Sequence, residues 1–113
     1  MANKEEVVKW IKVMVDKMNE ACPYTAEGWG GSVQLVIPDL GTGWLVKLAM
    51  DGTVESCDEK IDEEAATGVV EMDSDTFVGI FAKTIVAAEA SAEGKMRARK
   101  SMEALIKVFA PIA

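Results

Sequence analysis

Hydrophobic residues near the start of the chain recur at helical spacing. The apolar positions are Val7, Trp10, Ile11, Met14, Val15 and Met18. Charged residues occupy the other side, so the pattern predicts an amphipathic helix over residues 3–20. Asn3 is placed to cap the start of this helix, and Pro23 is expected to prevent its continuation.

After a glycine-rich loop at residues 25–31, the hydrophobic period changes to two. Val33, Leu35 and Ile37 alternate with other residues, which predicts a strand. A turn at residues 38–43 and the hairpin signal Asp51-Gly52 separate two further strands, expected at residues 44–50 and 53–57. Three consecutive short strands predict an antiparallel meander.

The second half of the chain mixes helical and strand periods. Residues 58–66 form an acidic connector, expected as an irregular segment or as one or two helical turns. The elements expected after it are a strand at 68–72, a helix starting at Asp73 and Ser74, a helical stretch over 84–92 ended by Gly94, a strand at 95–99 and a helix over 101–109. The last helix carries an apolar stripe of Met102, Leu105, Ile106 and Phe109 and ends before Pro111. This order predicts one α+β domain over residues 1–113.

Composition narrows the function classes. Half of the 113 residues are hydrophobic, which excludes a disordered chain. The net charge of −7 argues against nucleic acid and anionic membrane surfaces as partners. Charged residues interrupt the apolar positions near the N-terminus, so neither a secretory signal nor stable membrane insertion is expected.

The number of cysteines indicates the redox state of the cellular compartment, and the chain has two, Cys22 and Cys57. Two are too few for a disulfide framework. We expect free thiols and a soluble protein of the reducing cytoplasm, although a single bridge between the two is compatible with the sequence.

Several kinds of chemistry are missing from the sequence. The chain has no histidine, which removes the Ser-His and Cys-His nucleophile pairs and the commonest metal ligand. The acidic connector fails the calcium-loop pattern, because Glu63 stands where glycine is required. Gly41-Thr42-Gly43 lacks the third glycine of a dinucleotide fingerprint and is interpreted as a turn. We therefore predict no catalytic residue, no metal and no cofactor.

Lys95, Arg97, Arg99 and Lys100 form the one dense basic cluster. Two interpretations are open. The side chains either face water and pair with the acidic connector, or they capture a carboxylate or phosphate headgroup at the mouth of a cavity.

The second half of the chain contains several short sequence phrases in a characteristic order. These are Val69-Val70-Glu71-Met72, Ser74-Asp75-Thr76-Phe77, Ala90 ahead of Gly94-Lys95-Met96-Arg97-Ala98, and the closing helix. The chain resembles the sterol carrier protein 2 family in these phrases over about residues 68–109, and in the order of its elements upstream. Lys83 and Lys100 stand where the family often has glycine, and the usual proline between the two middle helices is absent. Family members have an apolar tunnel between the sheet and the helices, and these departures affect the expected shape of its mouth.

The resemblance implies a mostly antiparallel five-stranded sheet covered by helices, with an apolar tunnel between the layers. It further implies non-enzymatic binding and transport of a lipid or other apolar small molecule of the sterol or fatty-acyl class. By family position, the expected lining residues are Phe77, Phe81, Ile85, Met102, Leu105, Ile106 and Phe109. Trp44 is added from its strand face, and Trp29 as a lid residue in the glycine-rich loop.

Two other functions compete with the lipid carrier. An interaction or oligomerisation module would have a filled core and an exposed apolar patch, and a homodimer belongs to this class of hypothesis. An enzyme would need two carboxylates with shifted pKa values in one cleft.

Overall fold

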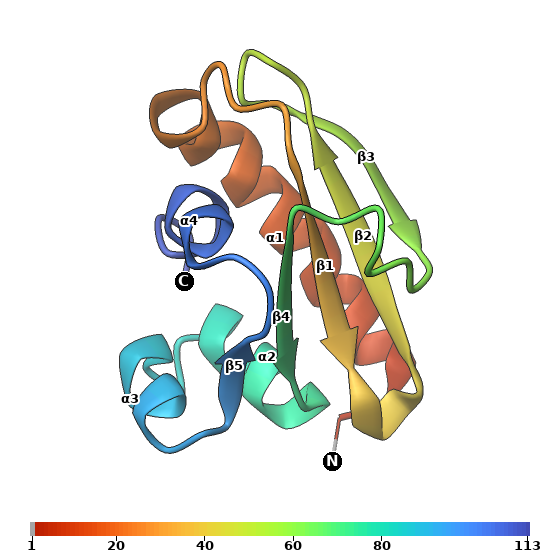
Figure 1. Cartoon of the computed structure of the whole chain (residues 1–113). Coiled ribbons are helices and arrows are strands. Elements are labelled where there is room, and N and C mark those ends of the chain that lie inside the picture. The colour runs from red at the N-terminus through yellow and green to blue at the C-terminus, as the bar shows by residue number, and fades with distance from the viewer. Residues whose placement is uncertain (1) are drawn as a thin grey trace.

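A computed structural model describes residues 2–113, and a five-stranded sheet lies at its centre (Figure 1). The strands, whose spatial order is β3-β2-β1-β4-β5, are β1 (Ser32–Ile37), β2 (Thr42–Leu48), β3 (Val54–Glu59), β4 (Gly68–Met72) and β5 (Met96–Ala98). The helical elements are α1 (Lys4–Thr25), η1 (Pro38–Leu40), α2 (Ser74–Phe81), α3 (Ala87–Ala92), α4 (Met102–Ala104) and the π-helical η2 (Leu105–Phe109). Only β1 and β4 pair in parallel, so the predicted α+β class and mostly antiparallel sheet are confirmed.

The first helix begins as predicted but ends later. The Asn3 side chain accepts a hydrogen bond from the backbone N–H of Glu6 at 2.8 Å. The helix then passes through Pro23 to Thr25, so the prediction that Pro23 prevents continuation is wrong. Proline removes one backbone donor, but tertiary contacts hold the last turn in place. Gly52 packs against the backbone of this turn, and the Thr25 hydroxyl donates to the carbonyl oxygen of Lys107 at 2.6 Å.

The two faces of the sheet are covered by different segments. Val33, Leu35 and Ile37 of β1 join the main core beneath α1 and α2. On the opposite face, Val36 packs with residues of β2 and β4 and with Ala66 of the connector. The alternation in β1 predicted a strand, and all six of its residues are buried because the connector covers the second face of the sheet.

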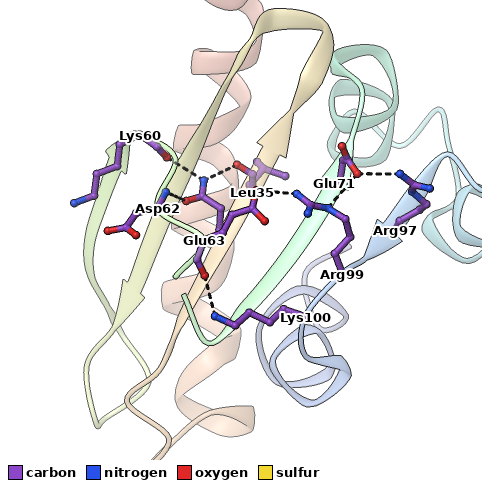
Figure 2. Close-up of polar contacts among 9 residues, drawn as sticks. Leu35, Lys60, Asp62, Glu63, Glu71, Arg97, Arg99 and Lys100 are labelled. Carbon is purple, nitrogen blue, oxygen red and sulfur yellow. Dashed lines mark hydrogen bonds and ion pairs between the residues drawn. The ribbon is translucent and has the colours of Figure 1, made fainter. Parts of the chain in front are cut away.

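A buried glutamine attaches this connector, residues 60–67, to β1. The Gln34 side-chain amide donates to the carbonyl oxygens of Leu35 and Lys60, each at 2.9 Å. Its carbonyl oxygen accepts from the backbone N–H of Asp62 at 2.8 Å. Figure 2 shows Lys60 and Asp62 on the connector beside Leu35. The connector therefore keeps an irregular path without helical turns, held by side-chain hydrogen bonds.

The second middle helix is shorter than predicted. The helical stretch expected over residues 84–92 begins only at Ala87, and residues 83–86 form a loop. Lys83 adopts a left-handed backbone with φ of 66°. The N–H groups of Thr84 and Ile85 then both donate to the carbonyl oxygen of Gly79, at 2.9 and 3.0 Å. These bonds turn the chain away from the helical path that the hydrophobic pattern suggested.

The C-terminal helix, here α4 and η2 together, presents a different face from the one predicted. The predicted stripe is wrong for Met102 and Ile106, which are 62% and 61% exposed. Phe109 of the predicted stripe is buried, together with Ala104, Val108 and, just beyond the helix, Ile112. A Cβ on Gly68 would lie 2.5 Å from the Cβ of Ala104, so helix and β4 approach closely only through small residues. The side of the helix that carries Ala104 therefore turns inward, and Met102 and Ile106 turn outward.

The cysteines are both free thiols, as expected, and both are shielded from water. Cys22 is buried in α1, and Cys57 is half-buried on β3. Burial raises the pKa of the Cys57 thiol to about 11, and the neighbouring charge of Asp58 adds to the effect. Burial also raises the pKa of Cys22, against a smaller opposing hydrogen bond from Thr25.

Replacement of Gln34 by leucine is expected to lower the free energy of unfolding by about 2–4 kcal/mol, because backbone groups of the connector lose buried partners. Urea denaturation measures this change. K60A is the matched control, since only the backbone of Lys60 contacts Gln34, and it should stay within about 0.5 kcal/mol of the wild type. A Q34L variant as stable as K60A would contradict this role of Gln34.

Alkylation by iodoacetamide at about pH 8 tests the shielding of Cys57. A pKa of about 11 instead of 9.0 lowers the thiolate fraction, and hence the rate, by about a hundredfold relative to an unperturbed thiol. Mass spectrometry of the native protein should show Cys57 and Cys22 largely unmodified, whereas both react in urea. Rapid alkylation of native Cys57 would show that this side of the sheet is open.

Candidate ligand-binding cavity

A cavity of about 370 Å³ opens between α3 and the C-terminal helix, above β5. Figure 1 shows these elements together on one side of the molecule. Its lining residues are Val86, Ala87, Ala88, Ser91, Met96, Leu105, Phe109, Ala110 and Ala113. Ser91 carries the one polar side chain among them, and no charged side chain lines the cavity. Such a surface suits apolar matter.

Three aromatic rings form a wall behind the cavity. Phe109 meets Phe81 edge to face at a centroid distance of 5.9 Å, and Phe81 packs against Phe77 at 5.0 Å. Deeper between the layers, Phe77, Met14 and Met18 are at most 1% exposed. The space between sheet and helices is therefore filled at its centre, and the hollow lies at the side of the helical layer.

The cavity exists because small residues face a widened helix. Ala87, Ala88 and Ser91 give α3 little side-chain volume on this side. Opposite them, the N–H of Ala110 donates to the carbonyl oxygen of Leu105 at 2.9 Å, a π-helical bond that spans five residues. π-Helical turns are uncommon and are found frequently at functional sites.

The structure brings part of the expected lining set together. Leu105 and Phe109 line the cavity, and Phe77 and Phe81 lie behind it. Ile85 is half-buried against Gly79, one residue before the lining begins. One continuous apolar region therefore contains Ile85 and the four residues Leu105, Phe109, Phe77 and Phe81.

The other expected residues lie elsewhere. Met102 and Ile106 are exposed, and Trp29 lies over Gly31 at the far end of α1. Trp44 is buried on β2 and faces a separate groove. The structure does not bring any of these four residues to the cavity.

Sequence reasoning missed most of the cavity's own residues. Val86, Ala87, Ala88, Ser91 and Met96 were not among the expected ones. The available signal was the run Ala87-Ala88-Glu89-Ala90-Ser91-Ala92, because a helix of small side chains leaves space against its neighbour. Hydrophobicity patterns predict which side chains are apolar, but they do not predict where small side chains leave a space.

A second groove of about 470 Å³ runs between α1 and the β2–β3 side of the sheet. Its lining residues are Val8, Ile11, Lys12, Val15, Asp16, Trp44 and Cys57. Two charged side chains belong to this groove, in contrast to the cavity beside α3. It is the weaker candidate for an apolar ligand.

The basic cluster pairs with acidic residues, as the first of its two interpretations predicted. Arg97 and Arg99 both contact Glu71 at 3.2 Å, and Arg99 reaches Glu63 of the connector at 2.9 Å (Figure 2). The ammonium group of Lys100 donates to the carbonyl oxygen of Glu63 at 2.8 Å. Arg97 and Glu71 are paired on the sheet face opposite Met96, so headgroup capture at the cavity by these arginines is not supported.

Residues 2–113 contain neither a cluster of metal-ligating side chains nor a membrane-spanning helix. No group of three or more His, Cys, Asp or Glu side chains is arranged to hold a metal ion. No helix in this range is long and apolar enough to cross a membrane.

Solved structures resemble this chain, whereas no family model and no curated protein matches its sequence. A crystal structure of sterol carrier protein 2 is 26% identical, with a TM-score of 0.61 over 93% of this chain and 85% of that one. Palmitated SCP2L2 from Aedes aegypti is 18% identical, with a TM-score of 0.64 over 94% of this chain and 90% of that one.

An enzyme contains a similar unit. The sec-alkylsulfatase Pisa1 from Pseudomonas sp. is 16% identical, with a TM-score of 0.65 over 90% of this chain. The chain spans only 16% of the length of that alkylsulfatase. From the sheet order, the helical layer and these similarities, the chain has a sterol carrier protein 2-like fold.

Proposed function

We propose that this domain binds and carries a lipid or other apolar small molecule, of the sterol or fatty-acyl class, in the cavity between α3 and the C-terminal helix. The observation that carries the proposal is a cavity of about 370 Å³ without a charged side chain in its lining. The palmitated neighbour of the same fold supports a fatty-acyl ligand. Pockets for small ligands have volumes of about 300 to 1,000 Å³, so the volume of this cavity is near the lower limit of that range.

Energetics favour a flexible chain as the occupant. Each buried methylene contributes about 0.8 kcal/mol, so an acyl chain could be held without a charged contact along its length. A narrow cavity with an open mouth accepts such a chain more readily than a rigid ring system. The exposed Val86 and Ala88 lie where the chain would enter.

We propose that the domain itself binds its ligand without catalysing a reaction. Its cavity offers one serine hydroxyl and no carboxylate, which supports this assignment. The alkylsulfatase neighbour is compatible with it, since a domain of this fold there is part of a much longer enzyme. A cytoplasmic location, suggested by two free thiols, belongs to the same proposal.

One observation favours a second candidate function, the interaction module. Tyr24, Met102 and Ile106 are large apolar residues that are 89%, 62% and 61% exposed, and a hydrogen bond from Thr25 to Lys107 ties the end of α1 to the C-terminal helix. Exposed apolar side chains of this kind suit contact with another chain. Homodimerisation stays a prediction, which sedimentation velocity over a range of protein concentrations checks.

Replacement of Ala88 by phenylalanine tests the cavity directly. The ring would fill part of the cavity, and exclusion of even two ligand methylenes at about 0.8 kcal/mol each should lower the affinity for a fluorescent fatty acid by about tenfold or more. A92F is the matched control, because Ala92 is also an exposed alanine on α3 but does not line the cavity. Fluorescence titration of both variants measures the effect. Equal affinities of A88F, A92F and the wild type would contradict binding at this site.

A further inference from the structure

Two lysines from different elements meet beside the end of the C-terminal helix. Lys17 lies on α1, and Lys83 lies in the loop between α2 and α3. They share a hollow of about 320 Å³, whose lining is Lys17, Glu20, Ala21, Lys83, Pro111, Ile112 and Ala113. The two are called the lysine pair below.

One carboxylate side chain, that of Glu20, lines the hollow beside the two ammonium groups of the lysine pair. Among residues 2–113, neither ammonium group forms an ion pair. The pKa of Lys17 is lowered, first by partial desolvation and then by the charge and hydrogen-bonding proximity of Lys83, while Glu20 acts in the opposite direction. Two adjacent ammonium groups repel one another, and an anion placed between them would relieve that repulsion.

The backbone holds Lys83 in a conformation that disfavours a side chain. Among the described residues it is the one non-glycine residue with positive φ. Its N–H donates to the carbonyl oxygen of Ile80 at 3.3 Å, and the next residue is bonded to Gly79. Left-handed backbone at a residue with a Cβ is unfavourable, and such strain clusters at functional sites.

The lysine pair adjoins the apolar cavity. The Lys17 ammonium lies 5.8 Å from the centre of the Phe81 ring, and Phe81 contacts Phe109 of the cavity lining edge to face. Ala113 lines both hollows. An amphiphile in the cavity could therefore extend past Ala113 and place its polar end at the two lysines.

We propose that Lys17 and Lys83 bind the carboxylate of a fatty acid whose acyl chain occupies the cavity beside α3. This inference rests on the proposed function and adds the ligand's class, an anionic amphiphile, and its orientation. Ammonium–carboxylate hydrogen bonds are charge-assisted and stronger than neutral ones. A neutral ligand of equal length would gain nothing from them.

The test compares palmitate with 1-hexadecanol, each displacing the neutral dye Nile red from the wild type and from the double variant K17Q/K83Q. The double variant should bind palmitate about tenfold more weakly, with the affinity for hexadecanol changed less than about twofold. K9Q/K47Q is the control, because it removes two charges from exposed residues that line neither the cavity nor the hollow of the lysine pair, and it should leave both affinities unchanged. Addition of sodium acetate should not shift the Lys83 amide resonance, whereas palmitate should.

Each contrary outcome overturns a distinct statement. Equal palmitate affinity in the wild type and K17Q/K83Q, with lipid still bound, overturns the lysine pair and leaves the cavity in place. Equal weakening by K9Q/K47Q assigns the effect to net charge and also overturns the role of the lysine pair. If acetate shifts the Lys83 amide resonance as much as palmitate does, the lysine pair binds a free anion, and the proposal of a fatty-acid carboxylate is overturned. Failure of both lipids to bind the wild type overturns the proposed function and this inference with it.

A K83G variant separates loss of binding from loss of folding. Glycine relieves the positive φ, so the melting temperature should be equal to or above that of the wild type, while palmitate affinity falls by about threefold or more. Unchanged palmitate affinity in K83G would remove Lys83 from the site.

Discussion

The contact between Gly68 and Ala104 fixes how the C-terminal helix lies on the sheet, and the cavity depends on that contact. A side chain at Gly68 would begin 2.5 Å from the Cβ of Ala104, so β4 and the helix can approach only through small residues. This closeness is consistent with a helix orientation in which Leu105 and Phe109 face α3 and Met102 and Ile106 face outward. The π-helical turn that follows then carries Ala110 and Ala113 to the same side.

Charge is distributed to match this arrangement. The arginines near β5 pair with Glu71 and Glu63, on the face of the sheet that the connector covers. The helical face keeps a cavity without charged lining, with the lysine pair next to it. An apolar hollow next to two ammonium groups is complementary to an amphiphile with an anionic end.

The sequence predicted the fold well because strand period, turn residues and caps are local signals. Asp51-Gly52 marked a hairpin, Asn3 and Asp73 marked helix starts, and Gly94 marked a helix end. Predictions failed where tertiary contacts outweighed local preference: at Pro23, whose turn is held by Gly52 and Thr25, and at residues 84–86, whose backbone bonds to Gly79. The lining of the candidate cavity includes Leu105 and Phe109 from the expected set, whereas the residues of α3 were not expected there. Periodicity identifies which side chains are large and apolar, whereas a cavity arises from where side chains are small.

The location of the ligand is the central claim, and intermolecular NOEs from ¹³C-labelled palmitate measure it most directly. Binding beside α3 predicts NOEs to the methyl groups of Val86, Ala88, Met96 and Leu105. NOEs to Val8, Ile11 and Val15 of the groove beneath α1, or none at all with palmitate in excess, would contradict it.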